Sequence, residues 1–240
     1  MTEKLSTEPD FSYIDENYAA VKENIAQAAL ASGRSPEDIT LMAVTKTVAP
    51  QPINHIISLG VDLIGENKVQ ELLSKIEFLN TDGLRMHIIG HLQSNKVRKI
   101  TGVVSCVESV DSISLADEIS KRCARSGCTM DVLLEVNIGS EEAKTGFTYD
   151  EAIERAFEIA EMPNIVLRGF MAVPPICEGD TVRRYFAKMN GLYLDAKSKL
   201  AGKATLDTLS LGMSADYAEA VKEGSTLVRV GSSLFGARRY

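Results

Sequence analysis

Short apolar segments alternate with helical patterns along nearly the whole chain of 240 residues, and this alternation restricts the fold more than any other feature. Between the segments, apolar residues recur with the spacing of amphipathic helices, as in NKVQELLSKIEFL and YDEAIERAFEIA. Strands that alternate with helices predict βαβ units, and therefore a parallel sheet. The predicted strands are residues 39–45, 61–65, 85–90, 103–108, 131–137, 165–172, 206–211 and 226–230.

Eight such units in a chain of this length favour one closed (β/α)8 barrel of the TIM type, an α/β fold. An extra N-terminal helix precedes the repeat, and Ile14, Val21 and Ile25 share one of its faces. An open doubly wound sheet is the alternative, but its nucleotide-binding form carries a G-x-G-x-x-G turn that is missing here. We predict a flexible N-terminus over residues 1–10 and a single domain over residues 11–240.

The charge balance and the cysteines exclude several classes of protein. Against 33 acidic residues there are 26 Lys and Arg, a net charge of −7, so nothing suggests a nucleic acid or an anionic membrane as a partner. The four cysteines form no C-x-x-C pair and no metal-like spacing with the three histidines. The polar N-terminus lacks a signal peptide, and no segment approaches the ~20 apolar residues of a membrane span. We expect a cytoplasmic protein.

Polar residues and glycines follow most of the predicted strands at the point where each strand ends. In a barrel of parallel strands these ends meet on one face, where barrel enzymes keep their active sites. We therefore expect the side chains that follow the strands to form one site. The most informative of them are Lys46 after the first strand, Asn67 after the second, Ser214 after the seventh, and Gly231 and Ser232 after the eighth.

Two Gly-Ser turns follow the seventh and eighth strands, the positions where barrels often bind phosphate. Gly212 and Gly231 would let the backbone approach an anion, and Ser214 and Ser232 would offer hydroxyl groups. The alternative is that both serines only cap the helices that follow them. Two such turns at these two positions leave a phosphate site and simple helix capping as equal alternatives.

Arg229 favours the phosphate site. The alternation in TLVRVGSS places it on the strand face opposite Val228 and Val230. In a closed barrel the eighth strand pairs with the first, so Arg229 and Lys46 would come from neighbouring strands about 5 Å apart. A second cation favours the neutral, nucleophilic form of a lysine amine. The alternative is that Arg229 pairs with a carboxylate such as Glu135 and closes a layer of the barrel.

A lysine amine, an adjacent arginine and a phosphate site formed by two turns together suggest a phosphorylated aldehyde as the ligand. Pyridoxal 5′-phosphate (PLP) fits this description. Lys46 would form the imine, the Gly212–Ser214 and Gly231–Ser232 turns would hold the phosphate, and Arg229 would meet the pyridine nitrogen. The alternative is a Schiff-base aldolase that acts on a sugar phosphate, which would have the same lysine and the same phosphate site.

Seven motifs resemble those of the YggS/PROSC family, the pyridoxal phosphate homeostasis proteins, in the order of that family. They are AVTKTV, GENKVQEL, HIIGHLQSNK, EVNIGSEEAKTGF, RGFMAVPP, LSLGMSADYAEAVKEGST and VRVGSSLFGAR, and the likeness extends from about residue 10 to residue 239. The resemblance implies one barrel similar to the N-terminal domain of alanine racemase. It also implies PLP as the cofactor, covalently bound to Lys46, with Ser214, Gly231 and Ser232 at the phosphate and Arg229 at the pyridine nitrogen.

The resemblance implies less for four other residues. Asn67 and His87 belong to motifs near the cofactor, and Met86 stands where many relatives have tryptophan. Lys144 matches a family lysine suspected of capturing a second PLP, and its alternative role is that of an ordinary loop lysine.

The resemblance favours a PLP-binding protein of vitamin B6 homeostasis over an enzyme. It would buffer PLP or deliver it, with PLP-requiring apo-enzymes as candidate partners, and we expect a monomer. The alternative is an amino-acid racemase-like enzyme, but such enzymes need a second, β-rich domain. They also need a second acid or base, for which His87 and His91 are the nearest candidates. An arginine at the pyridine nitrogen weakens the ring as an electron sink.

Overall fold

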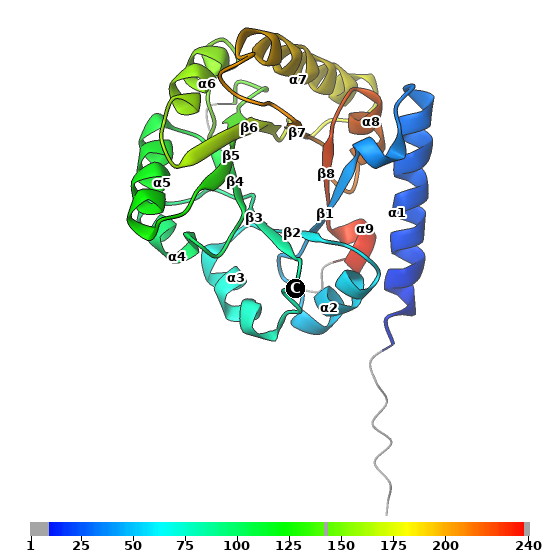
Figure 1. The fold of residues 1–240 in the computed structure, drawn as a ribbon. Coiled ribbons are helices and arrows are strands. Elements are labelled where there is room, and N and C mark those ends of the chain that lie inside the picture. The colour runs from blue at the N-terminus through cyan, green and yellow to red at the C-terminus, as the bar shows by residue number, and fades with distance from the viewer. Residues whose placement is uncertain (1–9, 142–143, 238–240) are drawn as a thin grey trace, which may run out of the picture.

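Eight parallel strands close into a barrel in chain order, and the last strand pairs with the first (Figure 1). The computed structural model describes residues 10–141 and 144–237, so the predicted flexible N-terminus lies, apart from residue 10, outside the described residues. The predicted (β/α)8 fold is confirmed. The strands are β1 Thr40–Val44, β2 Leu63–Glu66, β3 Arg85–Ile88, β4 Cys106–Val110, β5 Met130–Val136, β6 Ile165–Ala172, β7 Thr208–Ser210 and β8 Leu227–Val230.

Helices surround the barrel, and the predicted N-terminal helix α1 packs outside that ring against α2, α8 and α9 (Figure 1). The α-helices are α1 Ser12–Ala31, α2 Pro50–Ser58, α3 Val69–Lys75, α4 Val97–Ile100, α5 Ile113–Ser126, α6 Ala152–Ala160, α7 Asp180–Lys199, α8 Tyr217–Lys222 and α9 Ser232–Phe235. Short 3₁₀ helices are η1 Pro36–Asp38, η2 Ile76–Phe78 and η3 Ser94–Lys96.

The main core lies between the strands and the helices. Residues such as Ala43, Ile64 and Val228 point outward from the barrel into this core, and the predicted face of α1 joins it through buried Ile14 and Ile25. A parallel sheet is covered on both faces, which is why its strands read as nearly continuous apolar segments in the sequence.

The barrel lumen has an apolar part and a polar part. Met42, Leu63 and Leu227 form a small apolar cluster of their own. Glu108, Ser210 and other buried polar residues share the lumen with them. Because buried polar groups need hydrogen-bond partners, these side chains must satisfy one another.

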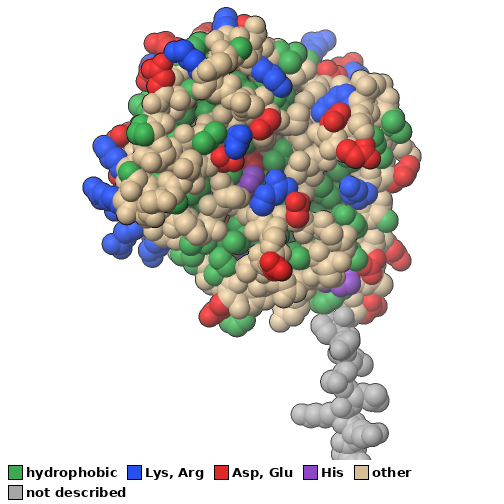
Figure 2. Space-filling model, in the orientation of Figure 1, with side chains coloured by type: hydrophobic (Ala, Val, Ile, Leu, Met, Phe, Trp, Pro, Cys, Tyr) green, Lys and Arg blue, Asp and Glu red, His purple; other side chains and the backbone are tan. Residues whose placement is uncertain are grey.

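The surface of the described part of the chain carries charges of both signs. On the face shown in Figure 2, Lys and Arg side chains are interspersed with Asp and Glu and form no uniformly basic surface. Among the described residues, no helix is long and apolar enough to cross a membrane, and no group of His, Cys, Asp and Glu side chains could hold a metal ion.

Candidate functional site

Lys46 lies in the turn that follows β1, two residues beyond the end of the strand at Val44. It lines a cavity of about 790 Å³ together with Gly231 and Ser232. The structure therefore brings three of the six predicted site residues to one cavity. The carboxyl ends of β1 and β8 lie side by side because these two strands close the barrel.

Ser214 connects the two turns that were predicted to hold a phosphate. Its Oγ accepts hydrogen bonds from the backbone N–H groups of Gly231 at 3.1 Å and Ser233 at 3.2 Å. The Ser233 hydroxyl in turn donates to the Ser214 carbonyl at 3.3 Å. Ser214 does not cap α8, the helix that follows it, but serves as an acceptor for the start of α9, and so the capping alternative is wrong for this residue.

Two different close contacts explain why Gly212 and Gly231 are glycines. A Cβ on Gly212, which has φ +89°, would lie 2.6 Å from the Cβ of Ala220 and 2.8 Å from the Cα of Tyr217. Gly212 is therefore required by the close packing of α8. A Cβ on Gly231 would lie 3.3 Å from the carbonyl oxygen of Val44, so Gly231 permits the close approach of the β8–α9 turn to the end of β1.

Asn67, directly after β2, carries a buried polar atom without a hydrogen bond. No partner for its Oδ1 is found within residues 10–141 and 144–237. The residue is packed tightly, because a Cβ on Gly90 would lie 2.6 Å from the Asn67 carbonyl oxygen. Asn67 as a whole is half-buried, but a buried amide oxygen without a protein partner is uncommon in folded proteins and suits a residue that contacts a ligand.

Arg229 is buried in the lumen, with 4% of its surface exposed. One guanidinium nitrogen, Nη1, donates to the carbonyl and the hydroxyl of Ser210 at 2.7 and 2.6 Å, and Nη2 donates to the Ala172 carbonyl at 3.0 Å. Burial lowers the pKa of Arg229, against the charges of Glu108, Asp216 and Glu135, which raise it.

The prediction that Arg229 lies across from Lys46 is wrong in register, although the two strands are neighbours as predicted. The pairing of β1 with β8 places Arg229 opposite Met42. The physical reason is that Arg229 lies within its strand whereas Lys46 lies beyond the end of β1. Arg229 does not line the Lys46 cavity.

A buried carboxylate that the sequence analysis missed, Glu108, links Arg229 to His87. Glu108 accepts a hydrogen bond from the Ser210 hydroxyl at 2.6 Å, and its other oxygen lies 2.7 Å from Nδ1 of His87. Burial raises the pKa of Glu108, but the hydrogen bond and charge of His87, the charge of Arg229 and the Ser210 hydroxyl outweigh burial, so the pKa is lowered. A glutamate inside the apolar segment VVSCVESV was the available signal.

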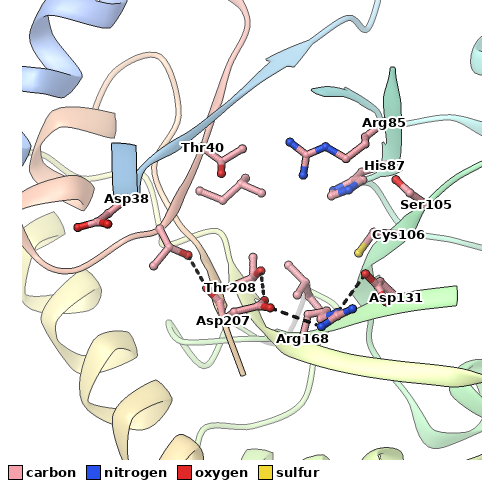
Figure 3. Close-up of a pocket in the computed structure, with 13 residues that line it drawn as sticks. Asp38, Thr40, Arg85, His87, Ser105, Cys106, Asp131, Arg168, Asp207 and Thr208 are labelled. Carbon is pink, nitrogen blue, oxygen red and sulfur yellow. Dashed lines mark hydrogen bonds and ion pairs between the residues drawn. The ribbon is translucent and has the colours of Figure 1, made fainter. Parts of the chain in front are cut away.

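His87 belongs to a second cavity, of about 400 Å³, at the amino ends of the strands. Figure 3 shows Arg85 and His87 reaching into it from β3, with Thr40 and Thr208 on the other side. Arg168 lies between Asp131 and Asp207 there, with ion-pair distances of 3.1 and 3.5 Å. His87 lines this cavity and not the one that contains Lys46, and its expected place near the cofactor stays a prediction.

Two further candidates are bound to neighbouring side chains. His91 Nδ1 lies 2.9 Å from Asp111, with its side chain more than half exposed. Lys144 forms an ion pair with Glu141 and donates to the Pro174 carbonyl at 3.3 Å. These contacts fit the interpretation of Lys144 as an ordinary loop lysine.

The chain is similar to known proteins along nearly its whole length. Residues 17–239 match the family described as alanine racemase, N-terminal domain. The pyridoxal phosphate homeostasis protein of Aquifex aeolicus is 40% identical over 227 residues, which cover 94% of this chain and 98% of that protein. PipY of Synechococcus elongatus, solved with PLP bound, has a TM-score of 0.80 at 27% identity, over 93% of this chain and all of that one.

A more distant likeness concerns the fold alone. Alanine racemase of Clostridium difficile has a TM-score of 0.71 at 17% identity, and the match covers 95% of this chain but 60% of the racemase. The chain belongs to the alanine racemase N-terminal domain family and, within it, to the pyridoxal phosphate homeostasis proteins.

Proposed function

We propose that this protein binds PLP as a Schiff base on Lys46 and buffers or delivers it inside the cytoplasm. The observation that carries the proposal is the bridge made by Ser214, which joins both predicted phosphate turns at the border of the Lys46 cavity. An amine and a group of anion-binding donors then adjoin the same cavity. The homeostasis proteins of the family and the PLP-bound structure of PipY support the choice of ligand.

The residues at this cavity fit the chemistry of PLP. The N–H groups of Gly231 and Ser233 now donate to Ser214 Oγ, and a phosphate oxygen is a stronger acceptor for the same donors. Ser232, at the first position of α9, adds its hydroxyl and its N–H to the phosphate side. Asn67 does not line this cavity, but its buried Oδ1 has no partner within the described ranges, which makes it a candidate contact for the polar substituents of the ring.

Arg229 does not line the Lys46 cavity, and we propose it for the pyridine nitrogen on the strength of the family resemblance. Its guanidinium is already fixed by Ser210 and Ala172, so an N–H directed at the ring would be preorganised. When bound, PLP supplies an aldehyde that condenses with a primary amine to a C=N bond, with loss of one water molecule. Lys46 supplies that amine, and its neutral form is the one that reacts.

We assign a carrier role in preference to the alternative, a racemase-like enzyme. Racemisation needs an acid or base on each face of the ring, and of the histidines considered, His87 is bound to Glu108 and lines the other cavity, while His91 is held by Asp111. Neither lines the Lys46 cavity. Apo-enzymes that require PLP are the proposed recipients, and we propose that the carrier is a monomer.

Turnover assays distinguish the two roles. The protein loaded with PLP is incubated with a panel of L- and D-amino acids, and chirality and products are followed over time. We expect changes in the absorption spectrum on binding without sustained turnover. Racemisation, decarboxylation or transamination near the median enzyme rate of about 10 s⁻¹ would assign the protein to the enzymes.

A further inference from the structure

A buried ion cluster borders the turn that carries Lys46. It consists of Glu66 at the end of β2 and of Glu71 and Lys75 on α3. Glu66 is 1% exposed and Lys75 is 9% exposed. The Lys75 Nζ atom lies 2.8 Å from Glu66 Oε1 and 2.6 Å from Glu71 Oε1. Charges so deeply buried need a structural or functional reason.

The hydrogen bonds of this cluster go to the backbone on both sides of Lys46. On the N-terminal side, Lys75 Nζ donates to the Thr45 carbonyl at 2.8 Å, and the Thr45 hydroxyl donates to Glu66 Oε1 at 2.8 Å. On the C-terminal side, the Thr47 N–H donates to Glu71 Oε1 at 2.5 Å. The two residues that flank Lys46 are thus both tied to the cluster.

The backbone conformation of Thr47 shows why these hydrogen bonds are needed. Thr47 has φ 64°, in the left-handed region that a β-branched residue avoids. Such a conformation persists only where the surroundings hold it, and it occurs most often at functional sites. The hydrogen bond from the Thr47 N–H to Glu71 holds this conformation here. If the strain were released, the turn would move and Lys46 would move with it.

Packing alone does not explain the cluster. Buried ion pairs can often be replaced by apolar side chains of similar volume without loss of stability. Burial raises the pKa of Glu66 by more than Lys75 and Thr45 lower it, and no partner for its Oε2 is found within the described ranges. Burial also acts on Glu71, but there Lys75 and the Thr47 N–H outweigh it and lower the pKa. Beyond its internal ion pairs, the cluster provides hydrogen bonds to Thr45 and Thr47.

We propose that Lys75, with Glu66 and Glu71, is a positioning residue that fixes the backbone around Lys46 and so orients its amine in the cavity. The cluster acts through Thr45 and Thr47 and does not itself touch the ligand. This inference rests on the proposed function, because it assumes that Lys46 forms the C=N bond with PLP. A correctly placed amine reacts faster than one that samples several orientations.

Two ligands distinguish an effect on the position of the Lys46 amine from an effect on the affinity of the site. PLP reports the rate of C=N formation through its absorbance. Pyridoxine 5′-phosphate has the same ring and phosphate but an alcohol in place of the aldehyde, so it reports only the noncovalent affinity. In Lys75→Met and Glu71→Ala we expect C=N formation to slow by about tenfold or more, with the affinity for pyridoxine 5′-phosphate kept within about twofold.

Two further variants serve as controls. Glu71→Gln keeps an amide oxygen that can accept from the Thr47 N–H, and it should recover most of the rate. Arg168→Met removes the ion pairs with Asp131 and Asp207 at the other end of the barrel. It should lower stability and leave the rate of C=N formation unchanged.

Wild-type rates in both Lys75→Met and Glu71→Ala would overturn the inference. An equal loss of affinity for pyridoxine 5′-phosphate would also overturn it, because the whole site would then be damaged. If Lys75→Met does not fold, Glu71→Ala decides, since Glu71 is partly exposed on its helix. Failure of the proposed function gives a different result, namely a wild-type protein that forms no C=N bond with PLP.

Discussion

Arg229 lies opposite Met42, not opposite Lys46, where β8 pairs with β1. Its guanidinium binds Ser210 on β7 and the Ala172 carbonyl at the end of β6, so one side chain ties three consecutive strands together. The same Ser210 hydroxyl donates to Glu108 on β4. Arg229 is therefore part of the polar core of the barrel as well as a candidate contact for a ligand.

We predict that Arg229→Met destabilises the folded protein by roughly 3 kcal/mol, because it leaves the buried carbonyls of Ser210 and Ala172 without their donor and removes a charge that lowers the pKa of Glu108. Urea denaturation followed by circular dichroism measures this difference. Arg229→Lys should recover only part of it, since an ammonium group cannot bind Ser210 and Ala172 together as the planar guanidinium does. A variant as stable as the wild type would show that the network contributes nothing to folding.

The lowered pKa of Glu108 predicts a dependence of stability on pH. A carboxyl group whose pKa is lower in the folded protein stabilises the fold above its ordinary pKa of 4.5, and this contribution is lost as the pH falls through the folded value. Glu108→Gln should therefore be less stable than the wild type at pH 7, and the difference should shrink below pH 4.5. Unfolding free energies across this range are the measurement, and a difference independent of pH would contradict the assignment.

Gly212→Ala should displace α8, because the added Cβ would lie 2.6 Å from Ala220 and the backbone has φ +89°. We expect a loss of at least about 2 kcal/mol, combining backbone strain with steric overlap. Gly202→Ala is the matched control, since Gly202 also has positive φ, at +82°, but its Cβ would meet nothing within 4 Å. Thermal denaturation of both variants should show the larger loss for Gly212→Ala, and equal losses would count against the close packing of α8.

The pattern of the sequence predicts the barrel well and the interior of the barrel poorly. Alternating apolar and helical segments specify eight strands, and the parallel arrangement brings Lys46, Gly231 and Ser232 to one end. The register between β1 and β8 depends on the stagger of the closed barrel, which no local pattern encodes. For the same reason the sequence did not predict which end of the lumen His87 faces.

The burial of Lys75 could not be predicted from the sequence either. In NKVQELLSKIEFL it looks like a surface lysine of an amphipathic helix. Only the tertiary contact between α3 and the β1 turn brings its ammonium group to Thr45 and Glu66. Likewise, nothing local indicated that Ser214 would accept hydrogen bonds from the β8–α9 turn and not from its own helix.

Ser214→Ala should weaken the binding of PLP by about tenfold, which corresponds to the loss of one hydrogen bond to a charged group, and should affect pyridoxal much less. Ser233→Ala is the milder control, because its backbone N–H remains and only its hydroxyl bond to the Ser214 carbonyl is lost. Fluorescence titrations with both ligands measure the ratio of affinities. An equal loss for PLP and pyridoxal would place the phosphate elsewhere.

The most direct test of the central proposal is to locate the covalent bond between PLP and the protein. Protein incubated with PLP is reduced with borohydride, digested and mapped by mass spectrometry. We predict a pyridoxyl group on the peptide that contains Lys46, with loss of the absorption band of the C=N bond on reduction, and no adduct at this position in Lys46→Ala. Label found at Lys144 or another lysine while Lys46 stays unmodified, or no label at all, would contradict the account.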